Sequence, residues 1–440
     1  MSKEYIKIAL AYVGVIVGAG LSSGQDILQY FLSFGKKGII GVILLGVLNV
    51  IFGRIMLTLG SYYQSDNHQD VLGKIAGPVM NKLIDLTLII AAFVMGFVMV
   101  AGAGANLNQQ FGIPAWTGAL ICSVLIVIVA YMDFNKITAI LGIFTPVIIV
   151  MILMVTAYTF IGKKYDFGEL DLAAKTIEPA VSNLWLSVIN YFSLCAMTGV
   201  SMAFVLGGSI VRIGTAEKGG LLGGSLIGLI ITCASLTLFA NIAEVKSMDI
   251  PMLEIMKEIH PAIAFVYTLV IFALIFNTAF SLYYATAKRF GKGNMKRTRI
   301  IMIGIVAAGY LCSFGGFKAL IGYLYPILGY MGVLLLVLLS VTWIRKKEFI
   351  KEEKYLRRHM IRLFLKQVDK AKKLTHRERK ILHQLSEASA ADASALREEV
   401  KNYTAQLSEN VEDVVEFAEE HLPVRMSTSE YVEQILHQKT

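Results

Sequence analysis

The sequence contains few charged residues for a chain of 440 residues. Charged residues make up 17% of it, whereas soluble domains carry about a quarter. The deficit is deeper before residue 345, because most charges lie in connections or beyond that point. What remains is a series of apolar runs of about 20 residues, each long enough to cross a hydrocarbon core of roughly 30 Å. These runs predict an integral membrane protein and exclude an ordinary soluble fold.

Catalytic and metal-binding signatures are also missing. The four cysteines fall inside apolar runs and the seven histidines lie outside them, so we expect no disulfide, no zinc site and no other transition-metal centre. The runs contain no paired carboxylates, histidine cluster or nucleophile elbow, and we therefore expect no enzyme. The net charge of +9 does not indicate a nucleic-acid partner, because the positive residues follow the connections of a membrane protein.

Ten apolar runs predict ten transmembrane helices. We place them at residues 6–33, 39–63, 82–108, 115–132, 137–161, 184–211, 219–242, 262–287, 299–314 and 317–344. An even number puts both termini on one side. Connections on that side hold most of the Lys and Arg residues, which predicts a multi-pass protein of the cell membrane with cytoplasmic N- and C-termini.

The composition changes after the last run. Residues 345–380 are strongly basic, residues 387–420 are mainly acidic, and apolar residues recur there at helical spacing. We therefore divide the chain into a transmembrane core, 1–344, and a cytoplasmic helical tail, 345–440. The basic part could lie on anionic lipid, or the tail could be a solvated stalk; a protein contact or oligomer through the tail is a further expectation.

The first run is interrupted by residues that do not suit a transmembrane helix. Gly18, Gly20 and Gly24 permit backbone angles that a helix does not use, and the polar residues after them would be costly against lipid. Unwound backbone at membrane depth must line an enclosed cavity, where free carbonyl and amide groups bind ions and solutes in secondary transporters. We therefore expect substrate contacts from Ala19, Gly20, Leu21, Ser22, Ser23, Gln25 and Asp26.

Two roles are open for Asp26. Its carboxylate could bind a cation, a proton or a substrate amine inside the membrane. Ser23-x-x-Asp26 also fits a capping box, in which Asp26 would cap the second half of an interrupted helix.

The sixth run contains a comparable stretch, so the two halves of the core, about 6–161 and 184–344, each open with an interrupted segment. That arrangement is typical of an inverted repeat with a binding site at the membrane midplane. It adds Tyr191, Phe192, Ala196, Thr198, Gly199 and Ser201 to the predicted substrate site. The alternative is that Gly, Ser and Thr here only allow close helix packing.

Other polar residues within the spans are few. Asn277, Thr278 and Ser281 present hard oxygen donors on one stretch of the eighth span, and they predict either an ion site or interhelical hydrogen bonds. Arg54 and Asp85 lie toward the cytoplasmic ends of the second and third spans, where they could pair, or Arg54 could extend to the membrane surface.

The run from Gly18 to Ile27 resembles the first-helix motif of the bacterial YkvI-like membrane proteins. That family is placed near the amino acid–polyamine–organocation superfamily. Over residues 5–344 the resemblance implies the five-plus-five inverted-repeat fold of the sodium-coupled leucine transporter. Ten transmembrane helices, with the first and sixth broken, are part of that expectation.

The resemblance also implies where ligands bind. Substrate would meet the backbone around Ala19–Ser23 and Ala196–Ser201. A sodium ion would lie between the first break, at Val17 and Gly20, and the eighth span. Thr278 would be a side-chain ligand there together with Ser281. The eighth span lacks the adjacent hydroxyl pair of sodium-dependent members, so sodium and proton coupling both stay open; no other cofactor is expected.

The sequence therefore predicts a secondary active transporter of a small organic, amino-acid-like solute, working by alternating access. The alternative is a membrane sensor or scaffold that has a transporter fold and signals through its tail.

Overall fold

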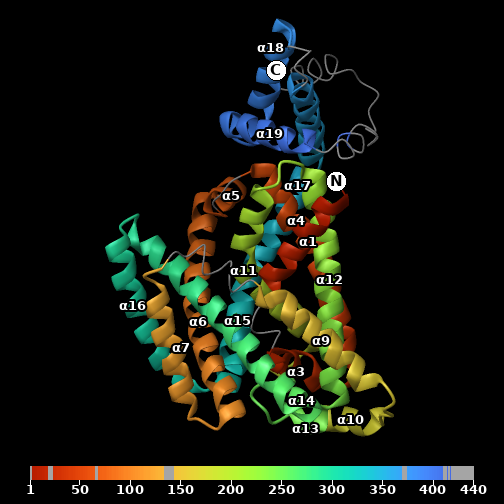
Figure 1. Cartoon of the computed structure of the whole chain (residues 1–440), viewed down its shortest axis with the longest axis vertical. Coiled ribbons are helices and arrows are strands. Elements are labelled where there is room, and N and C mark those ends of the chain that lie inside the picture. The colour runs from red at the N-terminus through yellow and green to blue at the C-terminus, as the bar shows by residue number, and fades with distance from the viewer. Residues whose placement is uncertain are drawn as a thin grey trace.

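The computed structural model describes residues 2–17, 23–64, 68–132, 143–368, 374–409, 414 and 417. Every regular element among these residues is a helix (Figure 1), which confirms the all-α prediction. The predicted substrate residues Ala19, Gly20, Leu21 and Ser22 lie outside the described residues.

The helices follow the apolar runs closely. The longer ones are α1 (Ser2–Ile16), α4 (Lys36–Tyr63), α6 (Pro78–Phe111), α7 (Ala115–Val129), α9 (Phe144–Phe160), α11 (Leu184–Gly208), α12 (Ile213–Ala240), α15 (Pro261–Gly291), α16 (Met295–Cys312), α17 (Phe317–Val368), α18 (His376–Ala388) and α19 (Ala393–Ser408). The shorter ones are α3 (Gln25–Tyr30), η1 (Leu32–Phe34), α5 (His68–Ile75), α10 (Phe167–Ala174), α13 (Ile242–Val245), α14 (Pro251–Ile259) and η2 (Ser313–Gly315).

The structure is that of a membrane protein. Within the described ranges, seven helices are long and apolar enough to cross a bilayer, namely α4, α6, α11, α12, α15, α16 and α17, while α7 and α9 are shorter apolar helices. Large apolar side chains such as Leu120, Val124 and Ile128 of α7 point outward and are exposed. In water such a surface would be a liability, but against lipid tails it is the expected exterior.

The membrane helices form two groups that lie side by side (Figure 1). The first group contains α1, α4, α11 and α12, which pack on one another; the second contains α6, α7, α15 and α16. α9 contacts both α12 and α15, and α17 contacts both α11 and α6, so these two helices connect the groups.

Glycines let the first group pack closely. Gly220, Gly224 and Gly228 recur every fourth residue along α12 and face α4. A Cβ atom at Gly228 would lie 2.9 Å from the Cα atom of Gly46 on α4, and one at Gly53 would lie 2.9 Å from the carbonyl oxygen of Gly220. Small residues at this spacing allow backbones to approach and supply the packing energy that lipid-exposed helices otherwise lack.

The first span is not one helix in the described residues. α1 ends at Ile16, Val17 is a bend, and α3 begins at Gln25. Gly24 before α3 has a φ angle of 82°, which residues other than glycine rarely adopt. The glycine signal in the sequence therefore predicted this interruption correctly.

The predicted break in the sixth span is wrong. α11 runs as one helix from Leu184 to Gly208. The Thr198 hydroxyl donates to the carbonyl oxygens of Leu194 and Cys195, at 3.2 and 3.0 Å, so it is satisfied within the helix. Small residues along this interface serve packing instead: a Cβ atom at Gly332 of α17 would lie 2.6 Å from the Ser193 carbonyl oxygen.

The predicted boundary at residue 344 falls within a helix. α17 continues for 52 residues, from the apolar run into the charged segment. Its second half packs with α18 and α19 around an apolar cluster that includes Leu356, Leu385, Leu396 and Val400. We call the end of the molecule that carries α18, α19 and the start of α1 the tail face, and the opposite end, with α3, α10, α13 and α14, the far face (Figure 1).

Candidate functional site

The short helix α3 is held in place by side chains of α11 and by α17. The Ser187 hydroxyl donates to the carbonyl oxygen of Tyr30 at 2.6 Å, and the Gln29 side chain donates to the carbonyl oxygen of Lys318 at 3.1 Å. All six residues of α3 are buried. A helix this short is not stable alone, so these contacts fix its position next to the first part of α11.

Asp26 is the charged residue of α3, and it faces α11. Its side chain is 2% exposed, and its Oδ2 atom accepts a hydrogen bond of 3.0 Å from the Tyr191 hydroxyl. The Tyr191 ring packs 5.0 Å from the ring of Tyr30 and edge-on to Phe31 at 5.5 Å. This packing therefore fixes the Tyr191 hydroxyl next to the Asp26 carboxylate.

Three polar atoms beside this contact have no hydrogen-bond partner within the described structure. They are Oδ1 of Asp26 and both amide atoms of Gln25, whose side chain is 0% exposed. An unsatisfied buried polar group costs about 1–3 kcal/mol, and a charged group costs more. Polar groups that a fold buries without satisfying are the groups that a ligand can satisfy.

A chain of hydrogen bonds supports the Tyr191 side of the site. The Tyr30 hydroxyl donates to Asn190 at 3.3 Å, and the Asn190 amide donates to the carbonyl oxygen of Pro326 at 2.8 Å. The next residue along α17 toward its start is Tyr325, which is 0% exposed and whose hydroxyl has no partner within the described ranges. Sequence reasoning missed Tyr325, because one aromatic residue in an apolar run carries no positional signal.

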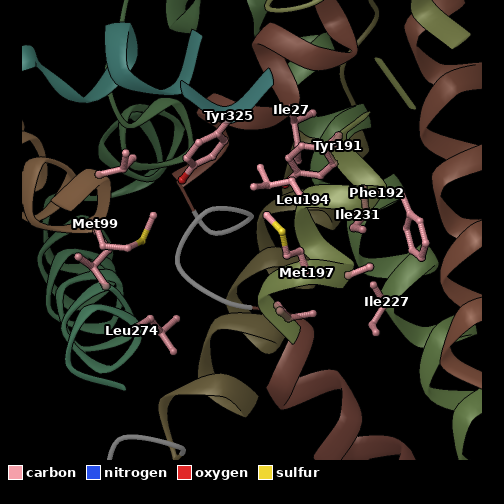
Figure 2. Close-up of a cluster of buried hydrophobic side chains, with 14 of the residues drawn as sticks. Ile27, Met99, Tyr191, Phe192, Leu194, Met197, Ile227, Ile231, Leu274 and Tyr325 are labelled. Atoms are coloured by element: carbon pink, nitrogen blue, oxygen red, sulfur yellow. The ribbon is translucent and has the colours of Figure 1, made fainter. Parts of the chain in front are cut away.

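Apolar side chains of both groups face the same region. Figure 2 shows the Tyr325 hydroxyl pointing away from its ribbon, between Met99 of α6 on one side and Met197 of α11 on the other; Leu274 of α15 lies further away, on the side of Met99. All four side chains are buried. Methionine is flexible and polarizable, so it adapts to ligands of varied shape. Tyr325 thus lies beside an adaptable apolar surface to which both groups contribute.

The capping box predicted for Ser23 and Asp26 requires Ser23 as the N-cap, but α3 begins after Gly24. The Ser23 hydroxyl accepts a hydrogen bond from the backbone amide of Gln25 at 3.2 Å, and the Asp26 carboxylate accepts one from the Tyr191 hydroxyl. The predicted capping role of Asp26 is therefore wrong, and its role as a ligand-binding residue stays a prediction.

The remaining predicted residues are placed differently. Phe192 packs against Phe52 of α4 at 5.1 Å and lies on the other side of α11 from Tyr325 (Figure 2). Ala196, Gly199 and Ser201 lie within the unbroken α11, whose backbone groups are committed to the helix. Their predicted backbone contacts to substrate are therefore not available in this structure.

The predicted ion residues lie on α15. The Thr278 hydroxyl donates to the Leu274 carbonyl oxygen at 2.9 Å, and Oδ1 of Asn277 is buried without a partner within the described ranges. Ser281 is half-buried on the same helix. Val17, at the end of α1, is buried and donates its amide to the Val13 carbonyl oxygen at 2.7 Å.

The suggested pair of Arg54 with Asp85 is wrong. Arg54 of α4 pairs with Glu217 of α12, which also pairs with Lys354 of α17, while Asp85 of α6 pairs with Arg289 of α15. The first pair joins helices of the first group and the last joins helices of the second. Partners this far apart along the chain are not visible in a sequence without its fold.

Helix α14 covers the site on the side that points toward the far face of the molecule. A Cβ atom at Gly24 would lie 3.0 Å from the Met252 side chain. The Gln109 side chain at the end of α6 donates to the Ile250 carbonyl oxygen at 3.1 Å and accepts from the Ile250 amide at 2.9 Å. Lys257 donates to the carbonyl oxygen of Gln109 at 2.6 Å. These bonds fasten α14 to the second group.

The arrangement of helices is that of known membrane transporters. An inward-facing structure of Mhp1 matches with a TM-score of 0.56 at 12% identity, covering 98% of this chain and 94% of Mhp1. MhsT in complex with L-phenylalanine matches with a TM-score of 0.50 at 16% identity, covering 91% and 96%. The chain therefore has the leucine-transporter-like fold, as its first-span motif implied.

Two proteins of Bacillus subtilis (strain 168) are similar in sequence. The membrane protein YkvI is 25% identical over 327 residues, which are 74% of this chain and 92% of YkvI. The protein YyaD is 26% identical over 343 residues, which are 78% of this chain and 98% of YyaD. No family model matches the chain. The resemblance to YkvI-like proteins is confirmed.

Proposed function

We propose that this protein is a secondary active transporter of a small, amino-acid-like organic solute, and that Asp26 and Gln25 bind the solute. The observation that carries the proposal is the set of buried, unpartnered polar atoms at Asp26 and Gln25, beside the interruption between α1 and α3. In a protein with the fold of membrane transporters, an interruption of this kind is where cargo binds.

The chemistry of the site suits an amine-bearing solute. Asp26 has no Lys or Arg partner within the described structure, and a buried carboxylate without a cation is unfavourable. A protonated amine would supply the charge, and the Gln25 side-chain amide would donate to a carboxylate of the same solute, or both donate to and accept from an amide. The apolar surface at Met99, Met197 and Leu274 would receive its side chain.

Transport would follow from motion of the first group against the second, with α9 and α17 connecting them. We propose that the tail face is cytoplasmic, because the connections at that end carry most of the Lys and Arg residues of the core. Either sodium, near Asn277, or a proton on Asp26 would couple the cycle. Coupling by a proton would neutralise Asp26 when no amine is bound.

The experiment starts from binding. Purified full-length protein is screened by thermal unfolding against amino acids and amines, with and without sodium, because a ligand of the folded state raises its apparent stability. Solutes that raise the midpoint are then tested for uptake into proteoliposomes. We expect Asp26→Asn to abolish both the shift and the uptake. Asp249→Asn, which changes a partly buried acid outside the spans, serves as the matched control and should retain both.

A panel in which no solute shifts the midpoint, or in which Asp26→Asn responds like the wild type, would refute the proposed site. The sensor alternative has one supporting observation, the docking of the tail on the transmembrane helices. It predicts ligand binding without uptake, so the proteoliposome assay separates the two functions.

A further inference from the structure

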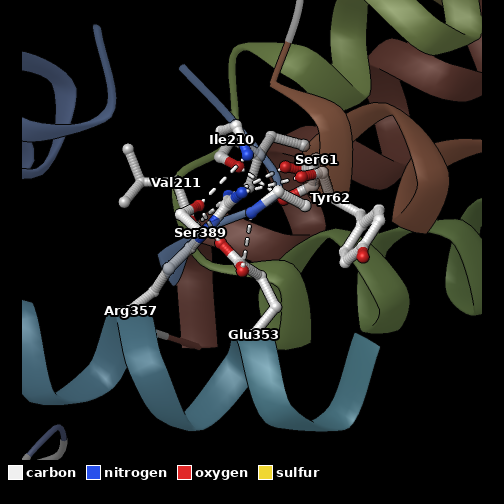
Figure 3. Close-up of polar contacts among 9 residues, drawn as sticks. Ser61, Tyr62, Ile210, Val211, Glu353, Arg357 and Ser389 are labelled. Atoms are coloured by element: carbon white, nitrogen blue, oxygen red, sulfur yellow. Dashed lines mark hydrogen bonds and ion pairs between the residues drawn. The ribbon is translucent and has the colours of Figure 1, made fainter. Parts of the chain in front are cut away.

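The second half of α17 contains a fully buried arginine. Arg357 is 1% exposed, and its Nε atom donates to Glu353 at 2.8 Å. One terminal nitrogen donates to the carbonyl oxygens of Ser61 and Val211, at 2.8 and 3.2 Å, and the other donates to that of Tyr62 at 2.9 Å (Figure 3). The Arg357 guanidinium therefore joins α17, the end of α4 and the connection between α11 and α12.

The acceptors are helix ends that need such a donor. Ser61 and Tyr62 belong to the last turn of α4, whose carbonyl groups have no partner within the helix. A cation is favoured there by the helix dipole, and the planar fork of arginine can serve several carbonyls together. The Ser61 hydroxyl also donates to the Ile210 carbonyl oxygen at 2.6 Å, which ties α4 to the connection between α11 and α12.

Glu353 carries the contact onward into the tail. It is 4% exposed, accepts from the Ser389 hydroxyl at 2.5 Å and from the Ala390 amide at 3.2 Å, and so holds the connection between α18 and α19. A buried ion pair with all its hydrogen bonds made is tolerated, whereas removing one partner is costly. The Arg357–Glu353 pair thus joins the tail to the core, and removing either residue would leave the other charge buried without its partner.

Two further contacts reach other helices of the first group. Lys354 pairs with Glu217 near the start of α12, and the Tyr403 hydroxyl of α19 donates to Glu4 of α1 at 3.4 Å. The tail therefore touches α1, α4, α12 and the connection before α12. The membrane half of the same α17 carries Tyr325 at the candidate site.

We propose that residues 345–368 and 374–409 form a clamp that holds the tail-face ends of α1, α4 and α12 together on α17 and so restrains opening of the site toward the tail face. In this proposal, the site opens toward the tail face when these ends separate from one another or from α17, and the contacts of Arg357 oppose that separation. The restraint itself stands on the contacts above. Its effect on transport rests on the proposed function.

The first test uses hydrogen exchange of the full-length protein without ligand. In Arg357→Ala, we expect backbone amides of residues 55–64 and 209–213 to exchange about tenfold faster or more, the factor for losing a hydrogen bond to a charged group. Lys351→Ala removes a half-exposed lysine of the same helix that pairs along the helix with exposed Glu348, and this variant should exchange like the wild type. Unchanged exchange in Arg357→Ala, or an equal rise in residues 295–300 of the second group, would overturn the clamp.

The second test measures access to the site. Cys195 is a native, half-buried cysteine one helical turn from Tyr191, and its reaction with N-ethylmaleimide reports opening. The other three cysteines are replaced by alanine. We expect Arg357→Ala to react several-fold faster and Arg357→Lys, which keeps the charge but not the fork, to fall between it and the parent protein. Equal rates in all three would show that the tail is tethered without restraining the site.

Neither measurement requires a substrate. If no solute is taken up but Arg357→Ala still speeds hydrogen exchange and Cys195 labelling, the transport proposal is refuted and the clamp stands. Faster uptake in Arg357→Ala would support both the clamp and the transport proposal.

Discussion

Replacing Tyr191 with phenylalanine removes a single oxygen atom from the centre of the candidate site. The ring keeps its packing, 5.0 Å from Tyr30 and 5.5 Å from Phe31. What disappears is the 3.0 Å hydrogen bond to Asp26, whose other carboxylate oxygen already has no partner in the described part of the chain. Hydrogen bonds to charged groups contribute about 1.5–3 kcal/mol, and we expect the free energy of unfolding to fall by that amount.

Two other tyrosines provide matched controls. Tyr12 and Tyr325 are both 0% exposed, and neither hydroxyl has a partner within the described ranges. Removing an unsatisfied buried hydroxyl should leave stability unchanged or raise it slightly. Without ligand, the three Tyr→Phe variants should therefore differ in stability according to whether the lost hydroxyl was hydrogen-bonded.

The assay is unfolding of detergent-purified protein by sodium dodecyl sulfate, followed by the loss of helix signal. Tyr191→Phe should unfold at lower denaturant than the other two. Tyr325→Phe should match the wild type without ligand but show a smaller ligand-induced shift, because its hydroxyl faces the binding region. Equal stability of Tyr191→Phe and Tyr12→Phe would show that the bond to Asp26 contributes nothing, and the reasoning on the site would fail.

Other predictions concern the scaffold. Asp171 of α10 accepts from the backbone amide of Lys36, the first residue of α4, at 2.7 Å, and its pKa is lowered by its hydrogen bonds with Lys175 and Lys36. Because the folded-state pKa is depressed, Asp171→Asn should lower the thermal unfolding midpoint at pH 7, and the difference should shrink as the pH falls below about 3.9, the ordinary value. Gly332→Ala should cost about 1–3 kcal/mol by overpacking, whereas Gly304→Ala, with no atom within 4 Å of the added Cβ, should cost nothing in the same unfolding assay.

The positions of the spans could be read from the sequence because the bilayer imposes a length on every helix. The run predicted at 82–108 became α6, which begins at Pro78 and ends before Gly112 with a φ angle of 70°. The interruption before α3 was also predictable, since three glycines followed by polar residues have no stable place in a lipid-facing helix.

The continuity of α11 could not be read in the same way. Gly, Ser and Thr occur both where a helix unwinds and where it packs closely, because hydroxyls bond to carbonyls one turn back and glycines admit a neighbour. Thr198 makes that bond, and the neighbour is α17. Only the tertiary partner distinguishes the two cases. The same holds for the partners of Arg54 and Asp85 and for the burial of Arg357.

One intact helix changes how the site is built. In the expected arrangement both halves of the core would offer backbone groups to the cargo. Here the first half contributes an interruption and the carboxylate of Asp26, while the second half contributes side chains from an unbroken helix, with Ser187, Asn190 and Tyr191 all directed at α3 or α17. Substitutions on α11 should therefore act through side-chain chemistry and be tolerated only where the new side chain keeps the hydrogen-bonding group. Substitutions at Gly24 should act through the backbone, because residues other than glycine rarely adopt a φ angle of 82°.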